Sequence, residues 1–342
     1  MERYVAIDNV CGWPNLTRLP NGDIIAAVFN QPCHGRWAGD VDCWASADEG
    51  ATWQFRGRAA PHDPGTNRMN IAVGLAHNGD LIVLTSGWSN KPEPGHGETK
   101  GAEDGCDIIA PWVCRSSDGG RTWRHAEGIA RADGYAFMIP YGDITRCPDG
   151  SLAAAAYARP AAGRHPMAAF FLRSRDDGHT WGEPVCISAD HYGEPATLHL
   201  GSGRWFAALR SIRFRRLDLF VSEDDGKSWR LDRPITGDDQ HPAHWLPLAD
   251  GRILLTYGMR HIGFMGLGAR FTNDGGKLWQ RAMVLTEFED AFDVGYPSCV
   301  ELKDGRILTA YYANRIAAHT RYHVGMVRWS IDEQMKRNAS LW

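Results

Sequence analysis

The sequence lacks several features that would place it in other protein classes. No run of about 18 apolar residues occurs, so no helix is expected to cross a bilayer. Lys and Arg number 37 against 41 Asp and Glu, and the net charge of −4 lacks the positive excess of a nucleic-acid binder. The segment Met1–Asp8 contains no apolar signal core. We therefore expect a cytoplasmic protein, or a secreted or periplasmic one if a leader has been removed.

Cysteine and histidine spacing gives no sign of a metal centre. The eight cysteines include no Cys-x-x-Cys pair and no zinc-finger arrangement with histidine. His241 and His244 are three positions apart, and on a strand that spacing turns the two side chains to opposite faces. The sequence thus predicts reduced cysteines that pack in the interior, no bound metal and no cofactor.

An eight-residue pattern, Ser-x-Asp-x-Gly-x-Thr-Trp, recurs along the chain, and we call it the Asp box. Asp and Ser side chains hydrogen-bond backbone amides in tight turns, Gly permits a sharp bend, and Trp fills space between neighbouring elements. The Asp box is therefore predicted to be a structural turn between two strands. Its copies are Ser46–Trp53, Ser116–Trp123, Ser174–Trp181, Ser222–Trp229 and, more loosely, Thr272–Trp279.

A second repeat alternates with the Asp box. Short turns that end in glycine, mostly Asn-Gly or Asp-Gly, join pairs of apolar runs, and such turns are typical of β-hairpins. Their glycines are Gly22, Gly79, Gly150, Gly203, Gly251 and Gly305. Six turns in 342 residues give a unit of 57 residues, read as strand, glycine turn, strand, loop, strand, Asp box, strand.

These units predict an all-β fold, a six-bladed β-propeller with four-stranded antiparallel blades and Asp-box turns, as one domain over residues 1–342. The sixth unit keeps only Ser330–Asp332 of the box and then becomes a polar tail. Its missing outer strand is expected to be Tyr4–Ile7, which would close the ring.

The two kinds of turn fall on one rim, so functional residues are expected on the opposite rim. That rim is rich in Arg, His, Tyr and carboxylates, and it includes His34 and Asp293. Guanidinium groups that converge on one axis repel one another unless an anion or carboxylates lie between them, and Arg matches a carboxylate in a planar fork. The sequence favours a pocket for an acidic ligand, with structural ion pairs as the alternative. Four arginines follow second strands, namely Arg159, Arg210, Arg260 and Arg315.

Over essentially its whole length the chain resembles the sialidase superfamily, six-bladed propellers that carry Asp boxes. Glu194 followed by Arg210 is similar to the glutamate and arginine of the fourth sialidase blade. Tyr296-Pro297-Ser298 is similar to the nucleophilic tyrosine and serine of the last blade, with one inserted proline, and Arg260 matches an arginine of the fifth.

The resemblance implies an exo-acting glycoside hydrolase that removes a terminal acidic sugar from a glycan. Tyr296 would be the nucleophile, Glu194 its base, and Asp40 or Asp42 the acid/base. A neutral tyrosine avoids the repulsion that a carboxylate nucleophile would meet from an acidic sugar. Arg210 and Arg260 would bind the sugar carboxylate.

The first unit departs from the family. Sialidases begin their first blade with Arg-Ile-Pro, whereas this chain has Gly12-Trp13-Pro14. Arg36 or Arg68 is the candidate substitute for the missing arginine. Two further residues, Arg315 and His244, complete the predicted substrate-binding set.

Two other functions fit the same rim. A histidine and a tyrosine beside an arginine suit proton abstraction next to a uronate carboxylate, which is lyase chemistry on uronic-acid glycans. A propeller of this kind also serves as a non-catalytic glycan-binding module. All three hypotheses share an acidic sugar or glycan as partner and involve neither nucleic acid nor a membrane.

Overall fold

The computed structural model describes residues 1–95, 106–161, 166–288 and 291–339. Within these ranges the chain forms 24 strands and one helix. That helix is too short to traverse a lipid bilayer. The predicted all-β class with four-stranded antiparallel sheets is therefore confirmed.

Four sheets in the described part of the chain have four antiparallel strands each. One contains β2 (Asn15–Arg18), β3 (Ile24–Phe29), β4 (Val41–Ser46) and β5 (Gln54–Ala60). The next contains β14 (Tyr192–His199), β15 (Trp205–Ser211), β16 (Arg216–Ser222) and β17 (Arg230–Pro234). A third contains β18 (Gln240–Pro247), β19 (Ile253–His261), β20 (Phe264–Thr272) and β21 (Met283–Phe288). The last contains β22 (Val294–Glu301), β23 (Ile307–Ala313), β24 (His323–Trp329) and β1 (Glu2–Asp8).

The remaining strands form one eight-stranded sheet made of two antiparallel four-stranded units. The first unit is β6 (Asn70–Leu75), β7 (Leu81–Ser86), β8 (Trp112–Ser116) and β9 (Arg124–Glu127). The second is β10 (Ile139–Arg146), β11 (Leu152–Ala158), β12 (Ala168–Ser174) and β13 (Gly182–Ser188). A short parallel pairing of β6 with β10 joins the two units.

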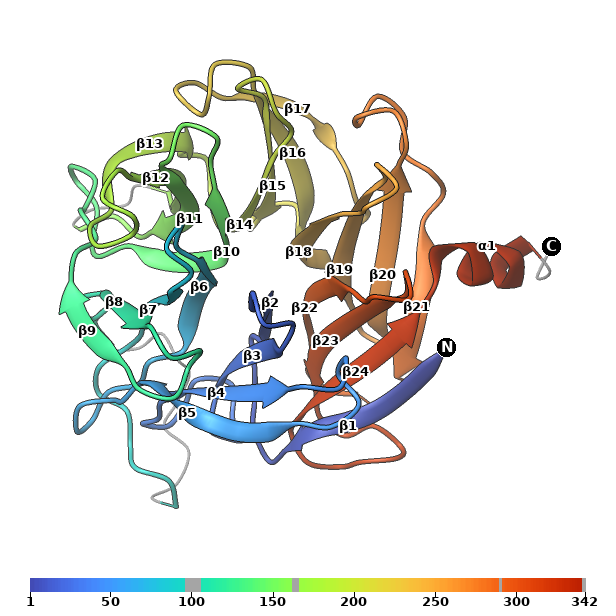
Figure 1. The fold of residues 1–342 in the computed structure, drawn as a ribbon, viewed down its shortest axis with the longest axis horizontal. Helices are drawn as coiled ribbons and strands as arrows, with labels where there is room; N and C mark the ends of the chain where they lie inside the picture. The colour runs from blue at the N-terminus through green and yellow to red at the C-terminus, as the bar shows by residue number, and fades with distance from the viewer. Residues whose placement is uncertain (96–105, 162–165, 289–290, 340–342) are drawn as a thin grey trace.

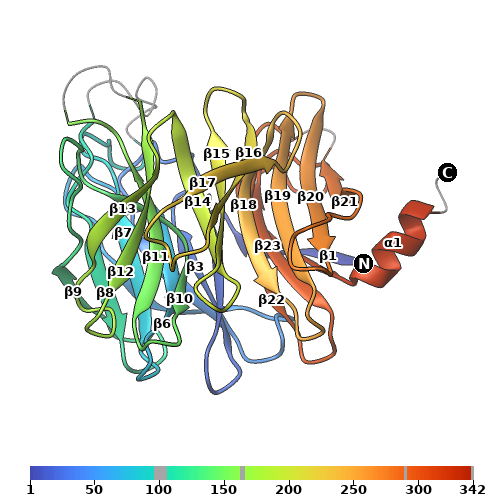
Figure 2. The ribbon, with the colours of Figure 1, turned by 90° about the horizontal axis from the view of Figure 1, so that it is seen from above.

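The sheets follow one another around a common centre (Figure 1). The strands nearest that centre are β2, β6, β10, β14, β18 and β22. Each of them is an edge strand of its sheet or four-stranded unit. The strands run between two rims, which are seen from the side in Figure 2. At the N-terminus β1 pairs antiparallel with β24, so segments from opposite ends of the chain share a sheet.

The interior lies between neighbouring sheets. One cluster joins Ile24 and Val28 of β3 to Leu308 of β23 and Met326 of β24. Burial of such apolar surface contributes roughly 25 cal/mol per Å² and holds adjacent sheets face to face. The eight cysteines are all unpaired, and six of them are buried, as the sequence predicted.

Each Asp box is a tight turn closed by its own side chains. In the second copy, Ser116 Oγ donates to Asp118 Oδ1 at 2.7 Å, and Thr122 Oγ1 donates to Asp118 Oδ2 at 2.6 Å. The glycine of the third copy, Gly178, has a φ of 86°. A methyl group there would collide with Ile82 of a neighbouring unit, so the box also sets the contact between units.

The C-terminal segment differs from the predicted polar tail, because residues after β24 form helix α1 (Ile331–Ala339). Asp332 and Glu333 lie in its first turn, where negative charge is favourable. Buried Ile331 and a 2.7 Å hydrogen bond from Gln334 to the Val284 carbonyl tie the helix to β21. The helix projects from the side of the molecule (Figures 1 and 2).

Replacing Asp118 by Ala should lower the free energy of unfolding by about 1 kcal/mol, because four turn-closing donors lose their acceptor. Slight burial raises the pKa of Asp118, but hydrogen bonds from Thr122 and Ser116 hold it below its usual range. The carboxylate thus stabilises the fold fully above the unfolded pKa of about 4, and the effect is lost progressively as the pH falls below that value through the lowered folded pKa. Urea unfolding of the variant and wild type at several pH values measures both effects. Asp133→Ala, at an exposed aspartate, is the control and should change little.

Candidate functional site

Two innermost strands bulge at the same place near one rim. The pairing register shifts between Gly193 and Ala196 in β14 and between Gly295 and Ser298 in β22. The residues at these bulges, Glu194 and Tyr296, have φ values of 33° and 53° in the left-handed region. Non-glycine residues in sparsely populated conformations cost about 1–3 kcal/mol each, and bulges re-aim side chains beside functional sites.

A tripeptide repeat, Gly-x-Pro, marks these bulges and was not recognised in the sequence analysis. It occurs at Gly193–Pro195 and Gly295–Pro297, at Gly12–Pro14 just before β2, and in a fourth copy at Gly182–Pro184 in the outer strand β13. The middle residue of the third copy, Trp13, also has a positive φ, of 48°. The same backbone geometry therefore directs Glu194, Tyr296 and Trp13 from three different sheets.

The bulges bring Tyr296 and Glu194 into direct contact. The Tyr296 hydroxyl donates a hydrogen bond of 2.6 Å to Glu194 Oε1. Arg210 Nη1, from the end of β15, lies 2.8 Å from the same oxygen and 3.5 Å from the Tyr296 hydroxyl oxygen. Only 7% of Glu194 and 6% of Tyr296 are exposed. A phenol, a carboxylate and a guanidinium are thus held together away from water.

The electrostatics of this group keep the phenol protonated at neutral pH. Burial raises the pKa of Tyr296, Glu194 raises it further, and Arg210 and Arg260 partly oppose the rise. The neighbouring His241 is neutral, because burial and the same two arginines lower its pKa to about 2. Release of the Tyr296 proton therefore requires an acceptor in place, and Glu194 is in hydrogen-bond contact with it.

A second cluster surrounds the carboxylate of Asp293, just before β22. Arg260 Nη2 lies 3.0 Å and the Tyr312 hydroxyl 2.8 Å from Oδ1. His34 Nδ1 lies 2.7 Å and the Tyr322 hydroxyl 3.1 Å from Oδ2. Burial raises the pKa of Asp293, but these partners hold it well below its usual range. The carboxylate stays charged at the centre of four polar groups.

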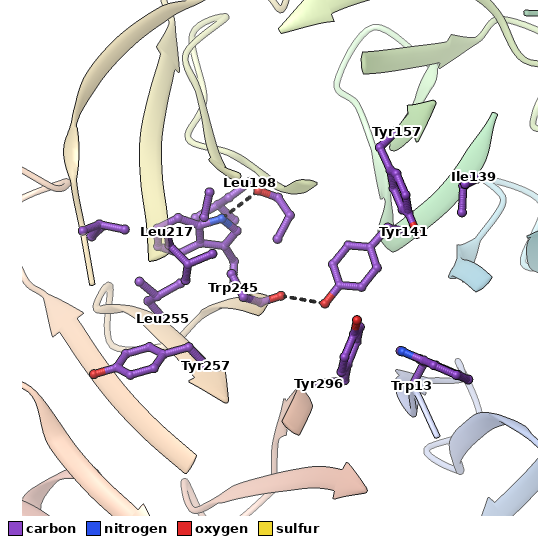
Figure 3. Close-up of a cluster of buried hydrophobic side chains, with 14 of the residues drawn as sticks. Trp13, Ile139, Tyr141, Tyr157, Leu198, Leu217, Trp245, Leu255, Tyr257 and Tyr296 are labelled. Carbon is purple, nitrogen blue, oxygen red and sulfur yellow. Dashed lines mark hydrogen bonds between the residues drawn. The ribbon is translucent and has the colours of Figure 1, made fainter. Parts of the chain in front are cut away.

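Aromatic rings connect the two clusters. Trp13 lies edge-on to Tyr296 with ring centroids 5.8 Å apart, and edge-on to His34 at 4.9 Å. Tyr312 lies 5.8 Å from Tyr296. Figure 3 shows Tyr296, Tyr141 and Trp13 pointing towards one central space. Glu194, Arg210, Arg260 and Tyr296 are therefore all brought together, as the sequence analysis required.

His244 lines a narrow cavity of about 20 Å³ that Tyr296 also borders, with room for about one water molecule. Its Nε2 lies 3.0 Å from Asp143 Oδ2, and Asn15 donates to the other oxygen of that carboxylate at 2.8 Å. Burial opposes protonation of His244, but Asp143 raises its pKa to about 10. His244 is thus a buried cation already paired with a carboxylate.

The predicted acid/base carboxylates lie in a different cluster. Asp40 and Asp42 lie 2.9 Å and 3.0 Å from Arg58 Nε, and Asp40 also contacts His62 Nδ1 at 2.6 Å. Within the described residues no hydrogen bond or ion pair joins either aspartate to Tyr296. Their assignment as acid/base is not supported by these contacts.

The other predicted arginines have contacts with residues other than Tyr296. Arg68 is buried, stacks 3.7 Å above the Trp112 ring and donates to the Ala110 carbonyl. Arg315 stacks on the Phe292 ring at 5.3 Å, and Arg159 on Trp88 at 4.9 Å. Arg36 lowers the pKa of Tyr322, which burial raises, and so lies near the Asp293 cluster.

Cys11, His34 and Asp293 form the one group within the described ranges with spacing suited to a metal, with ligand atoms within 4.8 Å of one another. Both oxygens of Asp293 already face two donors each. Burial raises the pKa of the Cys11 thiol well above its usual value, so the thiolate that metals require is disfavoured. The group is better described as a hydrogen-bonded cluster.

Comparisons with known proteins identify a family and a shared fold. A family described as BNR repeat-like domain matches residues 95–309. The search of curated proteins gave no match.

Solved structures share the fold at low identity. A protein of unknown function from Dyadobacter fermentans is 21% identical, with a TM-score of 0.81 over 97% of this chain and 98% of its own. The Hadza microbial sialidase is 17% identical, with a TM-score of 0.74 over 97% of this chain and 69% of its own. The leech intramolecular trans-sialidase, complexed with 2,7-anhydro-Neu5Ac, is 12% identical, with a TM-score of 0.70 over 98% and 69%. At these identities the likeness shows the fold.

Replacing Arg210 by Met should lower the free energy of unfolding by about 3 kcal/mol, because the buried Glu194 carboxylate loses its countercharge. The control is Arg213→Met, which breaks an exposed pair with Asp190 at 3.2 Å and should cost less than about 1 kcal/mol. Urea denaturation followed by tryptophan fluorescence at neutral pH measures both. Equal losses would show that Glu194 does not depend on Arg210.

Proposed function

Because the chain belongs to the BNR repeat-like family of the sialidase superfamily, we propose that it is a glycoside hydrolase that removes a terminal acidic sugar from a glycan. The 2.6 Å hydrogen bond from the Tyr296 hydroxyl to Glu194 carries this proposal. A phenol aimed at a buried carboxylate base is the arrangement that turns a weak nucleophile into a reactive one. The cations beside the pair favour an anionic substrate.

The same proposal includes the architecture. We infer that the six four-stranded units are the blades of a propeller over residues 1–342 and that β1 closes the ring by its pairing with β24. In this arrangement the innermost strand of each blade presents its first residues at the same end of the axis. Tyr296, Glu194, Arg210 and Arg260 then share one mouth, although they come from three sheets.

Arg210 and Arg260 would bind the carboxylate of the sugar. Each already pairs with one protein carboxylate, Glu194 or Asp293. Among the described residues, Nε and Nη2 of Arg210 and Nε of Arg260 donate no hydrogen bond, so donors remain for a ligand. Charge-assisted bonds of this kind are about twice as strong as neutral ones.

In the reaction, Glu194 takes the proton of Tyr296 as the phenolate oxygen attacks the anomeric carbon. Arg210 stabilises the charge as it moves between the two oxygens, since its Nη1 is near both. A carboxylate nucleophile would be repelled by an acidic sugar, whereas a phenol is neutral until it reacts. The covalent tyrosyl intermediate is then released by water.

One observation favours lyase chemistry on uronic-acid glycans as a second candidate. The Tyr312 hydroxyl lies 3.3 Å from His34 Nδ1 and 3.3 Å from Arg260 Nη1, which places a histidine and tyrosine beside an arginine. A lyase would release an unsaturated product that absorbs ultraviolet light, and a hydrolase would not. A glycan-binding module without activity would bind and release the same sugars unchanged.

Replacing Tyr296 by Phe should lower kcat by about 10³-fold on an aryl glycoside of a sialic or uronic acid, with KM changed by less than about threefold. The phenylalanine keeps the ring against Trp13 and removes only the nucleophilic oxygen. The assay is a panel of such glycosides, run with parallel detection of unsaturated product. Tyr135→Phe, at a tyrosine that packs on Phe170, is the control and should keep wild-type rates. Undiminished turnover in Tyr296→Phe would refute Tyr296 as the nucleophile.

A further inference from the structure

We propose that His34, oriented by Asp293, is the general acid and base of this site, the role that the sequence analysis gave to Asp40 or Asp42. The inference rests on the proposed function and adds a residue to its mechanism. It is carried by the position of His34 between a buried carboxylate and the aromatic wall around Tyr296.

The imidazole is held in one orientation by its Nδ1. This nitrogen lies 2.7 Å from Asp293 Oδ2, and the carboxylate is in turn fixed by Arg260, Tyr312 and Tyr322. A carboxylate that accepts the Nδ1 proton sets the tautomer and stabilises the imidazolium when Nε2 is also protonated. Asp293 is therefore a positioning residue, and Nε2 is the atom left for proton transfer.

His34 and Asp293 differ in how far their side chains are exposed to solvent. The His34 side chain is 36% exposed, whereas that of Asp293 is 10% exposed. Among the described residues Nε2 of His34 has no hydrogen-bond partner. The ring lies edge-on to Trp13 at 4.9 Å, and Trp13 lies edge-on to Tyr296 at 5.8 Å. The partly exposed imidazole thus lies one aromatic ring away from Tyr296.

The aspartates are less suited to this role. Asp40 contacts His62 and Arg58 through different oxygens, and Asp42 shares Arg58 with it. No described contact links this cluster to Tyr296, whereas His34 shares Trp13 and Tyr312 with it. Asp293 occupies the place of an orienting carboxylate next to a proton carrier.

The proton balance is complete without another reactant. When Tyr296 Oη bonds to the anomeric carbon, its proton passes to Glu194, and the glycosidic C–O bond breaks with its electron pair on the leaving oxygen. That oxygen takes the Nε2 proton of His34. Water then attacks the anomeric carbon and gives a proton to Nε2, while the released phenolate of Tyr296 recovers its proton from Glu194.

The test compares two leaving groups in the full-length protein. His34→Gln should lower kcat/KM by about 10²–10⁴-fold on a glycoside with an alcohol leaving group, which needs a proton to depart. It should lower kcat/KM by less than about tenfold on a nitrophenyl glycoside, which departs as a stable anion. His319→Gln, which breaks a 2.6 Å contact with Asp8 outside the site, is the matched control and should leave both rates unchanged.

A pH profile gives a readout that does not depend on the variant folding. In the wild type, kcat/KM for the alcohol glycoside should decrease at basic pH as the imidazolium is lost. The value of kcat/KM for the nitrophenyl glycoside should show no such decrease. The titratable and charged groups of the cluster around His34 are Asp293, Arg260, Tyr312, Tyr322 and Cys11. If kcat/KM decreases at basic pH with both substrates, or with neither of them, the assignment of His34 as general acid is overturned.

The outcomes separate this inference from the proposed function. Equal losses on both substrates in His34→Gln would make His34 structural and leave Tyr296 as nucleophile. Rates abolished by a chelator and restored by zinc would show that Cys11, His34 and Asp293 bind a metal, which also overturns the inference. A wild-type protein without turnover on any acidic glycoside would overturn the proposed function and this inference together.

Discussion

The hydrogen bond between Tyr296 and Glu194 spans 102 positions in the sequence, and it forms only because both residues occupy left-handed backbone positions before a proline. In an ordinary strand, successive side chains alternate between the two faces of the sheet. A bulge breaks that alternation, and here it lets Tyr296 and Glu194 meet. The conformational strain at these positions is offset by the apolar packing between sheets, so the rigidity of the surrounding sheets is a condition for the site.

Charge is balanced within the site before any ligand arrives. Arg210 pairs with Glu194, and Arg260 pairs with Asp293. Ion pairing and ligand binding are therefore compatible roles for the same arginines, since a guanidinium has five donor hydrogens and each pair uses only some of them. Paired carboxylates also prevent the two guanidiniums from repelling each other. The remaining donors are pre-positioned for an anion at little cost in side-chain entropy.

The sequence predicted the sheets well because the Asp box and the glycine turns repeat, and each repeat specifies a local turn. It also predicted Glu194, Arg210, Arg260 and Tyr296, because their places relative to the turns are distinctive. It did not predict the contacts of Asp40 and Asp42 with Arg58, since topology indicates the rim and not the partners of a side chain. Asp42 lies in β4, the third strand outwards, where Arg58 of β5 is its nearest partner. The partners of Asp293 come from three sheets, with His34 from the first, Arg260 from the sheet of β19 and the two tyrosines from its own, and no local pattern links them.

Trp13 explains how the first sheet contributes to the site without an arginine. Its Gly-x-Pro segment has the same left-handed geometry as those of Glu194 and Tyr296, but only 5% of the tryptophan is exposed. The ring contacts Phe29, His34, Tyr296 and Tyr312, so it supports neighbouring groups and leaves little surface for a sugar. An anionic ligand would then be bound by Arg210 and Arg260, which both lie beside Tyr296. The first sheet would supply rigidity and a proton carrier, while the fourth and fifth units would supply the charge.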